Sequence, residues 1–200
     1  MSEVLNVTTP VGDLEWLFIT GKGKKDQNDN DRFVASVVFD SDNSLAKELV
    51  SDINIFWETN KPKKAKEPKS LGFRELTDDE GNKTGRISFN FWTGTVFPDG
   101  SAKIVKVFNA KGAEVALGNK KIGNGSRGRI KGAMGVYDNG PGAIGVTLYL
   151  NGIQLTKFIE FTGGVSFDEV EDGDEDFEGF DEDGMHAISE DQEGESVPRL

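Results

Sequence analysis

The chain has 200 residues, with 35 acidic and 23 basic side chains, a formal net charge of −12 and no cysteine. A chain of this length typically forms one domain with an additional segment, and without cysteine it has neither disulfides nor thiolate metal sites. Since no stretch approaches the roughly 18 apolar residues of a membrane span and residues 1–10 lack the pattern of a signal peptide, we expect no membrane association and a cytoplasmic location.

Residues 13–20, 32–40, 86–94, 101–110, 127–138 and 143–158 alternate apolar and polar side chains or are rich in β-branched ones, which predicts β-strands. Residues 86–94 show the pattern well, because Ile87, Phe89 and Phe91 share one face. Trp16 and Trp57 are assigned to the core together with Phe89. These segments indicate a mainly β protein, either a small closed barrel or a sandwich.

One segment between the second and third strands has helical spacing. Leu45, Leu49 and Ile53, followed by Phe56 or Trp57, recur on one side of a helix over residues 43–60, with Asn43 or Ser44 as the cap. The connections at 21–31, 60–70, 77–83 and 117–132 are polar or rich in glycine and lysine, which predicts long loops.

The sequence offers no catalytic centre. There is no cysteine nucleophile, the only histidine is His186 near the C-terminus, and neither a phosphate-binding loop nor a dinucleotide fingerprint is present. The acidic stretch after residue 168 does not fit the register of a calcium-binding EF-hand loop. We therefore expect neither an enzyme nor a metal or cofactor site.

Two strands carry basic and aromatic side chains on the face away from the core. Strand parity places Arg127, Arg129, Lys131 and Tyr137 together, and Arg86 beside Trp92; Lys61, Lys63, Lys64, Lys66, Lys103, Lys120 and Lys121 extend this basic surface. A site for single-stranded nucleic acid needs cations along the path of the phosphates and aromatic rings that stack on the bases. Two plainer interpretations stay open: Trp92 covers a barrel end, and the row from Arg127 to Lys131 is a solvated edge strand that resists aggregation.

The acidity of the chain is concentrated at its end. Residues 168–200 hold 15 acids and one base, which leaves 20 acids and 22 bases, a net charge of +2, for residues 1–167. Such a composition predicts a disordered tail. The tail can compete with nucleic acid for the basic surface, or it can offer Phe177 and Phe180 to other proteins.

The order of "RISFNFWTGTVFPDG", then "GRIKGAMGVYDNGPGAIGVTLYLNGIQLTKF", then a polyacidic end resembles bacteriophage single-stranded DNA-binding proteins. The resemblance covers roughly residues 4–165 and the character of the tail. It implies an oligonucleotide/oligosaccharide-binding (OB) barrel of five to six strands with an inserted helix over residues 1–167, and a tail over residues 168–200. It also implies coating of single strands in phage DNA replication, recombination and repair, within the host cytoplasm at the nucleoid or at replication sites.

For the site, the resemblance implies contacts to DNA from Trp92, Arg127, Arg129, Lys131 and Tyr137. The tail is expected to contact the phage DNA polymerase and the helicase/primase. Tails of this family often end in phenylalanine, whereas this chain ends in Leu200; Leu200 or the internal phenylalanines would have to serve instead.

Other functions stay open on the sequence. An acidic interaction protein, such as a DNA mimic or an assembly chaperone, would use the tail and show no DNA affinity in its body. A module for double-stranded nucleic acid would contact phosphates through the lysine loop without stacking. The sequence also leaves open a homodimer and the choice between DNA and RNA.

Overall fold

The computed structural model describes residues 4–140 and 142–163, which belong to one compact unit. The boundary predicted at residue 167 and the predicted tail therefore lie outside the described residues, as do the tail residues Phe177, Phe180 and Leu200.

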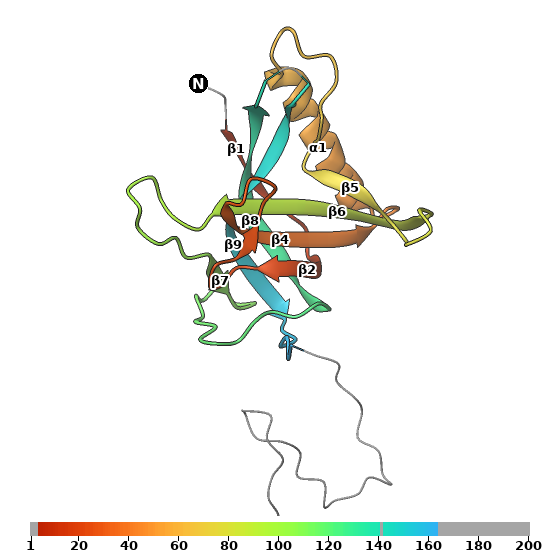
Figure 1. Cartoon of the computed structure of the whole chain (residues 1–200). Helices are drawn as coiled ribbons and strands as arrows, with labels where there is room; N and C mark the ends of the chain where they lie inside the picture. The colour runs from red at the N-terminus through yellow and green to blue at the C-terminus, as the bar shows by residue number, and fades with distance from the viewer. Residues whose placement is uncertain (1–3, 141, 164–200) are drawn as a thin grey trace, which may run out of the picture. The chain divides into compact units, whose positions relative to one another are not determined.

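Nine strands and one helix make up the described part of the chain (Figure 1). They are β1 (Val4–Thr8), β2 (Gly12–Phe18), β3 (Lys24–Lys25), β4 (Asp31–Asp40), α1 (Ser44–Asn60), β5 (Phe73–Thr77), β6 (Lys83–Gly94), β7 (Lys106–Phe108), β8 (Ser126–Asp138) and β9 (Ile144–Lys157).

Five of the strands close into a barrel. β8 pairs with β2, β2 with β4, and β4 with β6, all antiparallel. β6 then pairs in parallel with β9 over two residues, and β9 returns to pair with β8 along nearly its whole length. The mainly β fold, the OB-like closed barrel and the helix between barrel strands are thereby confirmed.

Period-two alternation explains how β4 and β6 face the core. Phe33, Ala35, Val37 and Phe39 of β4 are buried, and they lie opposite the buried residues of β6, with Phe39 paired with Ile87. Closing the sheet into a barrel brings these side chains together, so that the core occupies the barrel interior.

The helix forms where its spacing predicts. The Asn43 side chain accepts hydrogen bonds from the backbone N–H groups of Leu45 and Ala46, which otherwise lack a helical partner. α1 ends at Asn60, two residues before Pro62, because the residue before a proline disfavours helical backbone. The buried side chains of α1, which join the barrel core, are Ala46, Leu49, Ile53, Phe56 and Trp57.

Several details differ from the sequence prediction. Trp16 is 39% exposed rather than buried, because β2 has a bulge between Glu15 and Phe18 and Trp16 adopts a φ of 49° there. Leu45 is 52% exposed, since Ala46 takes the inward position on the first turn of α1. The predicted strand over 101–110 is reduced to β7.

Candidate nucleic-acid interface

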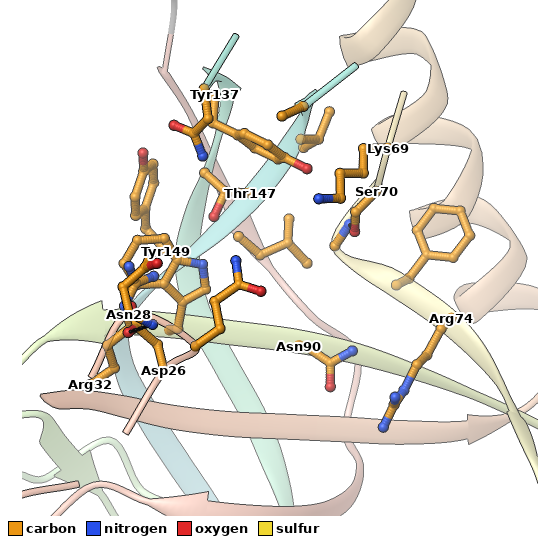
Figure 2. A pocket seen from close by; sticks show the side chains of 18 residues that line it. Asp26, Asn28, Arg32, Lys69, Ser70, Arg74, Asn90, Tyr137, Thr147 and Tyr149 are labelled. Atoms are coloured by element: carbon orange, nitrogen blue, oxygen red, sulfur yellow. Dashed lines mark hydrogen bonds and ion pairs between the residues drawn. The ribbon is translucent and has the colours of Figure 1, made fainter. Parts of the chain in front are cut away.

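A groove of about 710 Å³ lies on the surface of the barrel (Figure 2). Its walls come from the turn before β4, from β4, β6, β8 and β9, and from residues 69–74, which lead into β5. The side chains used in the argument below are Asp26, Arg32, Asn90, Trp92, Tyr137 and Tyr149.

Strand register brings the aromatic side chains of the groove together. Phe89 and Phe91 of β6 point into the core, so Trp92 points outward. Trp92 is the partner of Tyr149 in the short parallel pairing of β6 with β9. The two ring centroids are 5.7 Å apart and the rings are inclined at 58°, an arrangement within the usual range for aromatic pairs.

A guanidinium group lies on the indole of Trp92. The Arg32 Cζ atom is 3.8 Å from the centroid of the Trp92 ring, close enough for a strong cation–π contact. Both side chains are half-buried. The groove therefore already contains a planar cation stacked on an aromatic ring.

The turn before β4 fixes Arg32 in this position. The Nε atom of Arg32 lies 2.6 Å from Oδ2 of Asp26, while Oδ1 of Asp26 accepts the backbone N–H groups of Asn28 and Asn30. The hydrogen bond from the Asn30 N–H is the main cause that lowers the pKa of Asp26 below its ordinary value of 3.8. At neutral pH Asp26 is thus a carboxylate that anchors the turn and Arg32 together.

Tyr137 also lines the groove, from β8 (Figure 2). Its side chain is half-buried, and burial raises the pKa of its hydroxyl above the ordinary value of 10.0. Lys69 and Arg74 line the same groove, so that three cationic side chains, with Arg32, line the groove that contains the aromatic rings.

Of the residues predicted from the sequence, Trp92 and Tyr137 lie together in this groove. The expected neighbour of Trp92, Arg86, does not. It shares the outer face of β6 but lies six residues away, about 20 Å along a strand. Its guanidinium is bound to Glu15 at 2.7 Å and lies 3.8 Å from Asp13, so it is engaged with carboxylates of β2.

The basic row on β8 has the predicted alternation. Arg127, Arg129 and Lys131 are exposed, and Ile130 and Met134 are buried on the opposite face. The edge-strand interpretation is wrong, because β8 pairs with β1, β2 and β9. Arg129 donates to Gln154 at 2.7 Å, and Arg127 lies 3.4 Å from Asp13.

The remaining predicted lysines lie in loops. Lys103 donates to the Thr93 hydroxyl at 2.9 Å and lies over the Phe97 ring at 5.0 Å. Lys120 forms an ion pair with Glu160 at 2.8 Å, and Lys121 is exposed. None of these three lines the groove of Trp92.

Sequence reasoning missed Arg32, Lys69, Arg74, Asn90 and Tyr149. Strand parity already placed Asn90 on the same face of β6 as Trp92. It could also have placed Arg32 on the outer face of β4, because the next residue, Phe33, faces the core. These side chains come together only through the pairings of β4 with β6 and of β6 with β9, which join residues about 60 positions apart.

Within residues 4–140 and 142–163 no group of three or more histidine, cysteine or acidic side chains is placed to hold a metal ion. In the same part of the chain, no helix has the length and apolar character needed to cross a membrane.

Neither a protein-family model nor a curated protein sequence matches the chain. Solved structures do match it. The single-stranded DNA-binding protein gp2.5 of bacteriophage T7 is 18% identical, with a TM-score of 0.55 over 82% of this chain and 91% of that one. The chain has the fold of phage single-stranded DNA-binding proteins.

A second phage protein supports the same likeness. The single-stranded DNA-binding protein of bacteriophage Enc34, solved as a C-terminal truncation, is 12% identical, with a TM-score of 0.59 over 78% of this chain and 87% of that one. Its complex with single-stranded DNA matches with a TM-score of 0.56, at 12% identity over 79% and 89% of the two chains. At these low sequence identities, the similarity shows a shared fold.

Proposed function

We propose that the protein binds single-stranded DNA without strict sequence specificity, through the groove around Trp92. The observation that carries the proposal is the combination, in one open groove, of the Trp92–Tyr149 pair with the stacked guanidinium of Arg32. The fold shared with two phage proteins that are named for single-stranded DNA binding supports it.

The mechanism follows from the chemistry of these groups. The half-buried rings of Trp92 and Tyr149 can stack on any base, and each stacked base contributes about 1–3 kcal/mol. Lys69 and Arg74 supply positive charge for the phosphates, which gives affinity that falls as salt rises. Neither contact reads the identity of a base, so binding tolerates most sequences. Such a protein acts by binding rather than by catalysis.

The exposed row of Arg127, Arg129 and Lys131 extends the path of the phosphates beyond the groove. In this proposal the protein coats single strands during phage replication, recombination and repair in the host cytoplasm. Its acidic segment, residues 168–200, modulates DNA binding and recruits the polymerase and the helicase/primase. The charge contrast between a net −14 in this segment and +2 in the rest of the chain supports a competition with DNA.

The test is a binding titration of fluorescein-labelled oligo(dT), followed by anisotropy at several salt concentrations. It uses the full chain and a chain ending at residue 167, with a duplex of the same length as competitor. We expect tight, salt-sensitive binding to oligo(dT), weak competition by the duplex, and tighter binding after truncation. Equal competition by the duplex would favour a double-strand module, and no binding by either chain would favour an acidic interaction protein.

A further inference from the structure

The aromatic pair of the groove belongs to a longer row of side chains that continues onto β2. Phe18 of β2 pairs with Val34 of β4, and Val34 pairs with Trp92 of β6. Trp92 in turn pairs with Tyr149 of β9. Residues directly opposite one another in a sheet lie on the same face. These four side chains, the outer row, therefore cross four strands, a distance of about 14 Å at the usual strand spacing.

A bulge in β2 turns Phe18 to the outer face. Leu14 is fully buried, and regular alternation would turn Phe18, four residues later, toward the core as well. From Glu15 to Phe18, however, β2 takes three residues where its partner β4 takes two. The extra residue reverses the alternation, so that Phe18 is 41% exposed and Ile19 is buried. Bulges that re-aim a side chain are frequent next to functional sites.

Phe18 has a cation over its ring, as Trp92 does. The Nζ atom of Lys24 is 5.6 Å from the centroid of the Phe18 ring, within the range of a cation–π contact. Lys24 pairs with Arg32 where β3 runs beside β4, so the two cations are neighbours on one face of the sheet. Because Lys24 is exposed, its charge can attract a phosphate.

A single exposed phenylalanine on a protein surface needs no explanation. Phe18, by contrast, continues an apolar line, because the half-buried Val34 lies directly between it and Trp92. β2, β4 and β6 lie side by side in Figure 1. Phe18 and Trp92 are thus separated by two strand spacings, about 10 Å. Each ring has a cation beside it, which repeats the combination that single-stranded DNA requires.

We propose that Phe18 is a second stacking site for single-stranded DNA, reached by a strand that crosses the outer face of the barrel between β9 and β2. Lys24 contacts the phosphate next to the base that stacks on Phe18. This inference rests on the proposed function and extends the binding surface beyond the groove. Since stacking does not read the identity of a base, the second site lengthens the bound stretch without restricting its sequence.

Two substitutions of Phe18 in the full chain separate stacking from packing. Phe18→Leu keeps an apolar side chain without a ring, whereas Phe18→Trp keeps an aromatic face. Anisotropy measures their affinity for fluorescein-labelled oligo(dT) of about 16 nucleotides. We expect the affinity to fall about 5-fold or more in Phe18→Leu and to stay near that of wild type in Phe18→Trp. The slope of log affinity against log salt should be unchanged in both, because stacking releases no counterions.

Tryptophan fluorescence locates the base directly. Phe18→Trp in a Trp92→Phe background places an indole at the second site and removes the one in the groove. Binding of oligo(dT) should quench the added indole. Ile55→Trp in the same background is the matched control, since Ile55 is exposed on α1 and lies outside both the groove and the outer row. Its indole should show no such quenching.

Three results would overturn the second stacking site alone, with oligo(dT) still bound by wild type. The first is equal affinity of Phe18→Leu and wild type. The second is an equal loss of affinity in Phe18→Leu and Phe18→Trp, which would indicate that the packing of β2 matters rather than the ring. The third is the same fluorescence response from Phe18→Trp and Ile55→Trp. No binding of oligo(dT) by wild type would overturn the proposed function as well.

Discussion

Two cationic regions of this protein differ in how their charges are held. In the groove, Arg32 lies on an aromatic ring, is fixed by Asp26 and is half-buried. On β8, Arg129 and Lys131 are exposed on the outer face of the strand. A cation joined to an aromatic surface can position a base, whereas an exposed cation attracts phosphates through a screened charge. The two regions should therefore respond differently to mutation and to salt.

The largest effect should come from Trp92→Ala, which removes the stacking surface of the groove. We expect affinity for oligo(dT) to fall about 5- to 150-fold, the equivalent of 1–3 kcal/mol. Trp92→Phe is the matched control, because it keeps an aromatic face and should retain most of the affinity. Anisotropy titrations at one salt concentration measure both. An alanine variant that binds like wild type would show that bases do not stack there.

The double variant Arg129→Ala/Lys131→Ala should act mainly through salt dependence. If both side chains contact phosphates, the slope of log affinity against log salt should become less steep by about 1.4, that is 0.7 for each contact on a single strand. The slope for Trp92→Ala should match that of wild type. Identical slopes in all three proteins would remove β8 from the DNA path.

A third change separates stability from binding. Arg86→Ala removes the ion pair with Glu15 and the weaker contact with Asp13. Since this pair is partly exposed, we expect the free energy of unfolding to fall by about 1 kcal/mol or less. Urea denaturation measures this loss. Affinity for oligo(dT) should stay unchanged. A clear loss of affinity would show that Arg86 belongs to the DNA interface.

The smallest effect concerns a turn remote from the groove. Asp78 in the turn between β5 and β6 resembles Asp26, because backbone N–H groups, that of Asn82 foremost, lower its pKa below 3.8. A lowered pKa in the folded state contributes stability that is present above pH 3.8 and is lost as the pH falls through the lowered value.

Asp78→Asn keeps an oxygen acceptor but cannot titrate. The difference in urea midpoint between pH 6 and pH 3 should therefore be slightly smaller in this variant than in wild type. DNA binding should be unaffected, in contrast to changes in the groove. A midpoint difference equal to that of wild type would show that the turn carries no pH-dependent stability.

Much of the barrel was predictable because its strands obey local rules. Alternation over β4, β6 and β8 gave the correct inward faces, and the spacing of Leu49, Ile53 and Trp57 located α1. β1, β3 and β5 were missed because they are short, with five, two and five residues. Trp16 was misplaced because a bulge reverses the inward face of β2, and nothing in the local sequence pattern marks it.

The site was predictable only in part, for a physical reason. Trp92 and Tyr137 could be placed on outward faces from strand parity alone. The contact of Arg32 with Trp92 and the hydrogen bond from Ser36 to Asn90 arise between strands that are distant in sequence. Such contacts depend on register and barrel closure, which a single sequence does not specify.

The most direct measurement of the central claim is tryptophan fluorescence during titration with oligo(dT), in wild type and in Trp92→Phe. The chain has three tryptophans, and the difference between the two proteins isolates the signal of Trp92. We predict strong quenching in wild type and little in the variant, at concentrations where anisotropy shows that both are saturated. Equal quenching in the two proteins, or none in wild type despite binding, would contradict a site built on Trp92.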